Sequence, residues 1–173
     1  DITYRGDLIF DAKNRGSRAE VSVDSVFSGP WFSPNFTSGP DAAWDISLSS
    51  DVPIDLTLDT GSGSCDFNLS DLHLTNLYMD SGSGSIDLAL PAGSTFQAMI
   101  DSGSGSVNIS IPEDVGVRVE LDSGSGSFRP DERFVLVSGE RDDDGVWETE
   151  NFSTAGHTIT MDIDQGSGSI SLD

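Results

Sequence analysis

Aspartate residues at a fixed spacing are the strongest candidates for chemistry in this sequence. Asp59, Asp80, Asp101, Asp122 and Asp164 each stand two residues before a Gly-Ser-Gly-Ser tetrapeptide. Stacked repeats would place these carboxylates one above the other, where they repel unless they are solvated, protonated or bridged by a cation. Two interpretations follow: Asx-turn residues that accept hydrogen bonds from the next backbone N–H groups, or oxygen ligands of calcium. The spacing matches neither an EF-hand loop nor the calcium-binding nonapeptide ladder.

The other reactive side chains indicate no catalytic centre. His73 and His157 stand 84 residues apart, which places them about 15 to 20 Å apart along a stack of repeats, too far to share an ion. Cys65 occupies an inward position, which favours a buried, inert thiol. The sequence has no His-Glu-x-x-His, no Gly-x-Ser-x-Gly, no phosphate loop and no Cys pair. We expect no enzymatic activity, and no cofactor other than calcium.

Four asparagines lie in Asn-x-Ser/Thr sequons and are candidates for glycosylation: Asn35, Asn68, Asn108 and Asn151. They are four of only six asparagines, more than composition alone predicts, which favours a glycosylated surface protein. Serine-rich strands also generate such sequons by chance, so a chance origin without glycosylation stays open as the alternative.

A repeat of 21 residues determines the expected fold. Gly-Ser-Gly-Ser begins at Gly61, Gly82, Gly103, Gly124 and Gly166, so three successive spacings are 21 and the last is 42. Apolar residues alternate with polar ones on both sides of the motif, as in β-strands with one buried face. One such unit cannot bury its own apolar face, whereas stacking units about 4.8 Å apart can. The sequence predicts an all-β fold, a β-helix-like β-solenoid of 21-residue coils over residues 40–173.

The two ends and one irregular segment are expected to differ from the repeat. Residues 1–39 contain two strand-like segments and a Pro/aromatic loop, and we expect them to cap the solenoid, with an aromatic ligand groove as the alternative. Residues 128–151 break the register and predict a β-hairpin excursion inside one enlarged coil. The last coil ends at Ile170, Ser171 and Leu172 without an evident cap, which predicts an open edge for assembly with another chain.

Net charge excludes two classes of partner. The chain has 173 residues, with 30 Asp and Glu against 8 Lys and Arg, and a formal net charge of -22. Such a chain repels phosphate backbones and anionic lipid headgroups, so we expect neither nucleic-acid binding nor membrane-surface binding. No run of 18 apolar residues is present, so this segment is not expected to insert into a membrane. Partners should be other cell-surface components or further copies of the chain.

The repeats at Gly61, Gly82 and Gly103 resemble the β-strand-repeat, adhesin-like family known as toast-rack domains. Residues 52–59 and Gly145-Val146-Trp147 also resemble the extracytoplasmic C-terminal domains of LiaF-like cell-envelope stress proteins. The resemblance implies a non-enzymatic structural or adhesin-like module that is extracellular or on the surface of a bacterial or archaeal cell. Two alternatives are kept: a subunit of an extracellular filament that assembles head-to-tail through solenoid ends, and a sensor or regulatory domain of envelope stress.

Overall fold

The computed structural model describes residues 2–4, 8–16, 18–25, 44–141 and 143–173. The chain divides into two compact units, Asp1–Leu48 and Ser49–Asp173. The sequence placed this boundary after residue 39. It lies further along the chain because β4 (Trp44–Ile46) pairs antiparallel with β1 (Ile2–Tyr4) and so belongs to the first unit.

The first unit contains two small antiparallel sheets. One joins β1 to β4, and the other joins β2 (Leu8–Arg15) to β3 (Arg18–Ser25). None of its described side chains is buried, and Ile9, Phe10 and Val21 are exposed. The Pro/aromatic loop lies outside the described residues, so the capping role of this unit stays a prediction.

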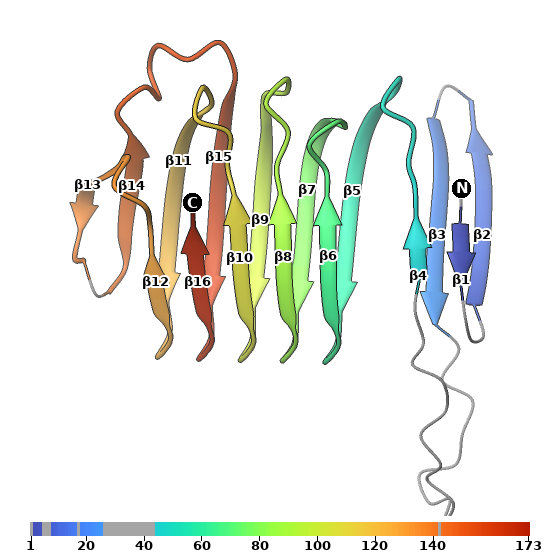
Figure 1. Cartoon of the computed structure of the whole chain (residues 1–173), viewed down its shortest axis with the longest axis horizontal. Helices are drawn as coiled ribbons and strands as arrows, with labels where there is room; N and C mark the ends of the chain where they lie inside the picture. Colours follow the sequence, from blue (N-terminus) through green and yellow to red (C-terminus); the bar gives the residue numbers. More distant parts are fainter. Residues whose placement is uncertain (1, 5–7, 17, 26–43, 142) are drawn as a thin grey trace, which may run out of the picture. The chain divides into compact units, whose positions relative to one another are not determined.

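The second unit consists of strands in two sheets (Figure 1). Seven of its strands form one sheet: β5 (Pro53–Thr60), β7 (His73–Ser81), β9 (Phe96–Ser102), β11 (Gly116–Ser123), β13 (Phe134–Gly139), β14 (Gly145–Thr149) and β15 (Thr158–Gln165). Five strands form the other: β6 (Ser64–Asn68), β8 (Ser85–Ala89), β10 (Ser106–Ser110), β12 (Ser127–Arg129) and β16 (Ser169–Leu172). The prediction of an all-β fold is confirmed.

Each Gly-Ser-Gly-Ser corner joins a strand of the seven-stranded sheet to the next strand along the chain, which lies in the five-stranded sheet. We call each such pair of strands a coil. Within each sheet, neighbouring coils pair parallel and in register, as Asp66 pairs with Asp87 and Asp87 with Asn108, 21 residues apart. Alternation of apolar and polar residues explains the arrangement, because every second side chain of a strand points to the same face. The apolar face of each sheet therefore meets that of the other.

The coils do not stack in the order of the sequence. The sheet orders are β13-β14-β11-β15-β9-β7-β5 and β12-β16-β10-β8-β6. The C-terminal coil, β15 with β16, therefore lies between the β9–β10 coil and the β11–β12 coil (Figure 1). The prediction of an open assembly edge at Ile170, Ser171 and Leu172 is wrong, because β16 pairs with β10 on one side and β12 on the other. Ile170 and Leu172 are 0% and 2% exposed.

The predicted hairpin is present, but it extends a sheet instead of widening a coil. Strands β13 and β14 pair antiparallel, and β14 continues the seven-stranded sheet beyond β11, also antiparallel. The sheet is therefore mixed rather than purely parallel. Trp147 of β14 is 1% exposed and lies against Phe128, with ring centroids 5.8 Å apart. The hairpin thus covers the end of the core at the β11–β12 coil.

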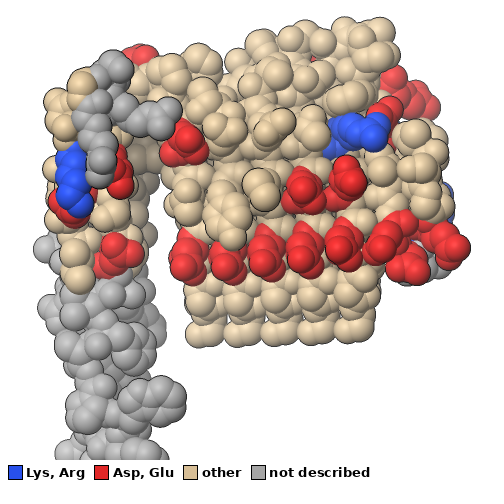
Figure 2. All heavy atoms as spheres, turned by 180° about the vertical axis from the view of Figure 1, so that it is seen from behind, with Lys and Arg blue, Asp and Glu red and all other residues tan. Residues whose placement is uncertain are grey.

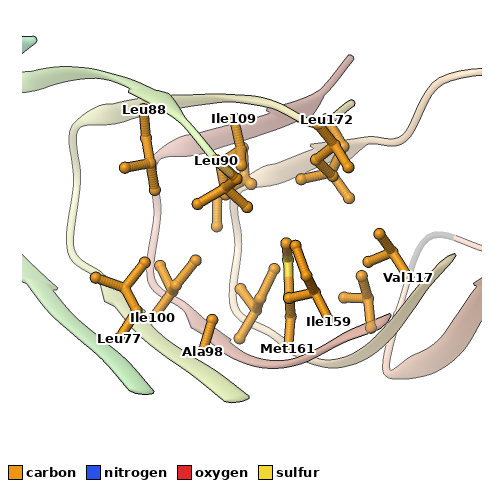
Figure 3. Packing of buried hydrophobic residues seen from close by; sticks show 14 of the residues in the cluster. Leu77, Leu88, Leu90, Ala98, Ile100, Ile109, Val117, Ile159, Met161 and Leu172 are labelled. Atoms are coloured by element: carbon orange, nitrogen blue, oxygen red, sulfur yellow. The ribbon is translucent and has the colours of Figure 1, made fainter. Parts of the chain in front are cut away.

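The core lies between the two sheets. Figure 3 shows Leu88, Ile109 and Leu172 of one sheet directed toward Ala98 and Met161 of the other. At the β5–β6 coil the inward side chains are only partly buried, because this coil has a neighbouring coil of its own unit on one side only. These side chains are Ile54, Leu56, Leu58, Cys65 and Phe67.

Glycine is required at the corners because successive coils approach each other closely there. A Cβ atom on Gly84 would lie 1.8 Å from the carbonyl oxygen of Gly63, and one on Gly105 would lie 2.0 Å from that of Gly84. At Gly63 itself, in the first coil, a Cβ atom would meet nothing within 4 Å. The requirement therefore comes from stacking rather than from the turn.

Candidate functional site

Five aspartates form one continuous row across the seven-stranded sheet, which we call the aspartate ladder. Strand pairing places them in the order Asp59, Asp80, Asp101, Asp164 and Asp122, each opposite the next. All five are exposed. Figure 2 shows acidic side chains running as a straight line across this face. The predicted stacking of these residues is present, but Asp164 lies inside the row rather than at its end.

Asp101, at the centre of the ladder, has another ladder carboxylate on the strand at each side. Desolvation by burial raises the pKa of Asp101, and the neighbouring carboxylates of Asp80 and Asp164 raise it further. Each neighbour disfavours a second negative charge at the strand spacing of about 4.8 Å. A cationic group placed over this row would relieve that repulsion.

The predicted Asx-turns do not form. Among the described residues, no hydrogen bond is made by the five ladder carboxylates. The N–H groups of the corners instead donate to the adjacent coil: Gly82 to the Thr60 carbonyl (2.8 Å) and Gly103 to the Ser81 carbonyl (2.7 Å). The turn is held by stacking, and the carboxylates are left for solvent or a partner.

One acidic residue at the end of the ladder is not identified by the repeat. Asp143 stands 21 residues after Asp122 in the sequence, but it is the carboxylate of Asp144 that accepts the hydrogen bond from the Ser123 N–H group, at 2.9 Å. Asp143 instead accepts the N–H of Asp144 (3.0 Å). Asp144 lies just before β14 of the hairpin, where periodicity no longer applies.

Metal binding is not demonstrated by the geometry. Across the described parts of the chain, no group of three or more His, Cys, Asp or Glu side chains is placed to hold a metal ion. The ladder is a line rather than a cage, whereas calcium takes six to eight oxygen ligands. Calcium binding by Asp59, Asp80, Asp101, Asp122 and Asp164 stays a prediction.

A second polar row lies on the outer face of the five-stranded sheet. Asp87 accepts a hydrogen bond from the Asn108 side-chain amide (2.8 Å), and the side-chain oxygen of Asn108 accepts one from Ser171 Oγ (2.7 Å). Asp66 pairs with Asp87 at the start of this row. These groups bond to one another, so they are less available to a partner than the ladder.

The described sequons differ in whether the side-chain amide of the asparagine already donates a hydrogen bond. Asn68 is exposed at the end of β6, and its side-chain oxygen accepts the Ser70 hydroxyl at 2.6 Å. The amide of Asn151 donates to the carbonyls of Glu113 (3.3 Å) and Val115 (3.4 Å), and that of Asn108 to Asp87. Asn35 lies outside the described residues. Glycosylation stays a prediction, and Asn68 is the described sequon asparagine whose amide nitrogen makes no hydrogen bond.

The remaining predicted residues lie apart from the ladder. His73 and His157 are exposed. Cys65 pairs with Ile86 as the repeat predicts, and burial raises the pKa of its thiol, which disfavours the reactive thiolate. It is only partly buried because it belongs to the β5–β6 coil.

A hollow of about 450 Å³ lies near the C-terminus, lined in part by Ser110, Glu113, Arg133 and Asp173. Arg133 is already occupied there, since its side chain donates to Asp131 (2.7 Å) and to the backbone carbonyls of Ile111 (3.2 Å) and Pro112 (3.4 Å). This arginine holds a loop to the core and is not free to bind an anion.

This chain is similar to known proteins in sequence and in fold. The profile of the family described as the N-terminal domain of toast_rack, DUF2154, matches residues 6–110. The chain belongs to the toast-rack family. The crystal structure of a proposed cell adhesion protein from Clostridium sporogenes is similar to this toast-rack chain, with a TM-score of 0.71 and 21% sequence identity. The match covers 99% of this chain and 79% of that one, and it shows a shared fold. No curated protein sequence gives a match.

The described part of this toast-rack chain contains no helix that is long and apolar enough to cross a membrane.

Proposed function

We propose that this toast-rack chain is a non-enzymatic, adhesin-like module that is extracellular or on a cell surface, and that it binds a cationic partner through the aspartate ladder. One observation carries the proposal: five exposed carboxylates stand in register and make no hydrogen bond among the described residues. Family membership and the similarity to a proposed adhesion protein support the surface role.

The sheet gives the ladder its selectivity in this proposal. Paired strands hold the carboxylates about 4.8 Å apart along a line. A partner with basic groups repeated along its surface would meet several of them at once, and the gain from each contact would add up without further ordering of the ladder. The net charge of -22 would draw such a partner toward the whole molecule before contact.

Binding of the labelled chain to envelopes of the cells that produce it tests the proposal. The test variant replaces all five ladder aspartates by asparagine, which keeps shape and removes five charges. The matched control removes five exposed charges elsewhere in the second unit: Asp51→Asn, Asp66→Asn, Asp71→Asn, Asp114→Asn and Glu113→Gln.

We expect the ladder variant to lose binding by about tenfold or more. The control should stay within about twofold of the unchanged chain, because it loses the same net charge but keeps the ladder. Equal losses in both variants would show that only net charge matters. Unchanged binding by the ladder variant would contradict the proposal.

The two alternative functions stay predictions. The filament interpretation has lost the edge on which it rested, because β16 is paired on both sides. Edges of the second unit remain at β5 and β6 on one side and at β12 and β13 on the other. Nothing in the described residues favours the envelope-stress sensor over the surface module.

A further inference from the structure

A row of polar side chains lies directly beneath the aspartate ladder. The residue after each ladder aspartate points inward in the strand alternation, and strand pairing aligns Ser81 with Ser102 and Ser102 with Gln165. These three residues are 1%, 0% and 1% exposed. Bulk solvent therefore does not reach them.

The middle of this row lacks hydrogen-bond partners, whereas its ends have them. Thr60 Oγ1 donates to the Asp80 carbonyl (3.4 Å), and Ser123 Oγ to the Gly124 carbonyl (3.5 Å). Ser81 Oγ, Ser102 Oγ and Gln165 Oε1 have no partner in the described protein. Buried polar atoms are nearly always bonded to protein or to ordered water, because leaving them unpaired is costly.

Gln165 shows which group the interior of a corner accommodates. Its Nε2 donates to the Gly168 carbonyl at 3.2 Å. The same nitrogen is 2.7 Å from the position a Cβ atom would take on Gly126 of the adjacent coil. The amide thus fills the corner and bonds a glycine carbonyl.

Serine cannot do the same in the neighbouring coils. Register makes Gly84 and Gly105 the equivalents of Gly168, because Ser85, Ser106 and Ser169 pair with one another. A serine side chain ends well short of the position that the glutamine amide occupies. The corners of the β7–β8 and β9–β10 coils therefore contain a buried hydroxyl without a partner and a glycine carbonyl, but no side-chain amide that reaches this carbonyl.

We propose that each of these two corners binds one ordered water molecule in the position of the Gln165 amide. One water bridges Ser81 Oγ and the Gly84 carbonyl. The other bridges Ser102 Oγ and the Gly105 carbonyl and donates to Gln165 Oε1. Each site is polar and offers at least two partners, as a buried water requires. The two waters link the coils beneath the ladder, and this role does not depend on what the ladder binds.

Counting long-lived water molecules by oxygen-17 relaxation dispersion tests this proposal. The double substitution Ser81→Gln and Ser102→Gln supplies both corners with the amide that Gln165 already provides. We expect the count to fall by two relative to the unchanged chain. The control, Ser83→Gln with Ser104→Gln, adds the same atoms at exposed positions of the corners and should leave the count unchanged. An equal count in all three proteins would overturn the proposal.

Thermal unfolding of Ser102→Ala gives a second, independent readout. If Ser102 binds a water, its removal deletes a hydrogen bond, and the midpoint should fall by about 2–4 °C in a chain of this size. If the hydroxyl is truly unpaired, alanine removes an unfavourable buried group and the midpoint should rise, which would contradict the proposal.

Discussion

Asp101 occupies the centre of the aspartate ladder, with one carboxylate on the strand at each side. Its raised pKa results from desolvation first and from Asp80 and Asp164 second. Its charge therefore opposes the folded state, where the three carboxylates are aligned, more than the unfolded state, where they are apart. This residue connects the aspartate ladder to the stability of the fold.

Replacing Asp101 by asparagine should stabilise the protein at neutral pH. The folded state binds the Asp101 proton more tightly than the unfolded state, so protonation stabilises the fold. That contribution is complete below the ordinary pKa of 3.8 and is lost as the pH rises through the raised folded value. The advantage of Asp101→Asn should therefore shrink as the pH falls toward 3.8. Urea unfolding midpoints across this pH range measure it.

Asp59→Asn is the matched control, because Asp59 ends the ladder and has a single neighbouring carboxylate. Its stabilisation at neutral pH should be smaller than that of Asp101→Asn. A gain of the same size at both positions, or one independent of pH, would argue against repulsion along the row.

Spacing in the sequence was sufficient to identify the ladder residues, because parallel in-register pairing keeps equivalent positions opposite each other. It could not identify Asp144, which reaches the end of the row from a hairpin outside the repeat. It also gave no sign of the unpaired oxygens beneath the ladder, since these depend on how far each side chain extends into the corner.

The corner glycines should be essential only where another coil stacks against them. Gly84→Ala would place a Cβ atom 1.8 Å from a backbone oxygen, which cannot be relieved without separating two coils. We expect a loss of about 1–3 kcal/mol or more in the free energy of unfolding. Chemical denaturation followed by circular dichroism measures this loss.

Gly63→Ala provides the control within the same motif. Nothing lies within 4 Å of its added methyl group, so the change should stay within about 0.5 kcal/mol. Comparable destabilisation by both substitutions would mean that the turn, and not the stacking, requires glycine.

The β13–β14 hairpin should stabilise the fold mainly through Trp147. Trp147→Ala leaves a large cavity beside Phe128 and should cost about 3–5 kcal/mol. Trp147→Phe should cost clearly less, because it keeps most of the contact and removes an indole N–H that has no partner among the described residues. Val137→Ala, at a side chain 54% exposed on β13, should change the free energy of unfolding by no more than about 0.5 kcal/mol. A similar effect of all three on urea unfolding would contradict this role of the hairpin.

The sequence predicted the existence of this hairpin but not its pairing. The break in register and the Arg-Asp-Asp-Asp-Gly turn indicate two antiparallel strands. They do not show that β14 joins the seven-stranded sheet beside β11, because this contact depends on the edge that the inserted C-terminal coil leaves free.

For the second unit as a whole, the order of the coils is the feature that periodicity leaves undetermined. Strand β16 pairs with β10 across 63 residues, three full periods, with the same kind of register as neighbours 21 residues apart. Every corner carries the same glycines, so each coil could stack on any other. The repeat predicts which positions are equivalent, and the three-dimensional structure shows which coils touch.

Disulfide formation between ladder positions tests this order most directly, in a Cys65→Ser background that removes the one native thiol. Adjacent strands lie about 4.8 Å apart, within the Cα separation that a disulfide spans, whereas two strand spacings exceed its limit of about 7 Å. The observed order of the coils predicts that Asp101→Cys with Asp164→Cys oxidises readily in the native protein and that Asp101→Cys with Asp122→Cys does not. Rapid disulfide formation between positions 101 and 122, with none between 101 and 164, would show that the coils stack in sequence order and would contradict the insertion of the C-terminal coil.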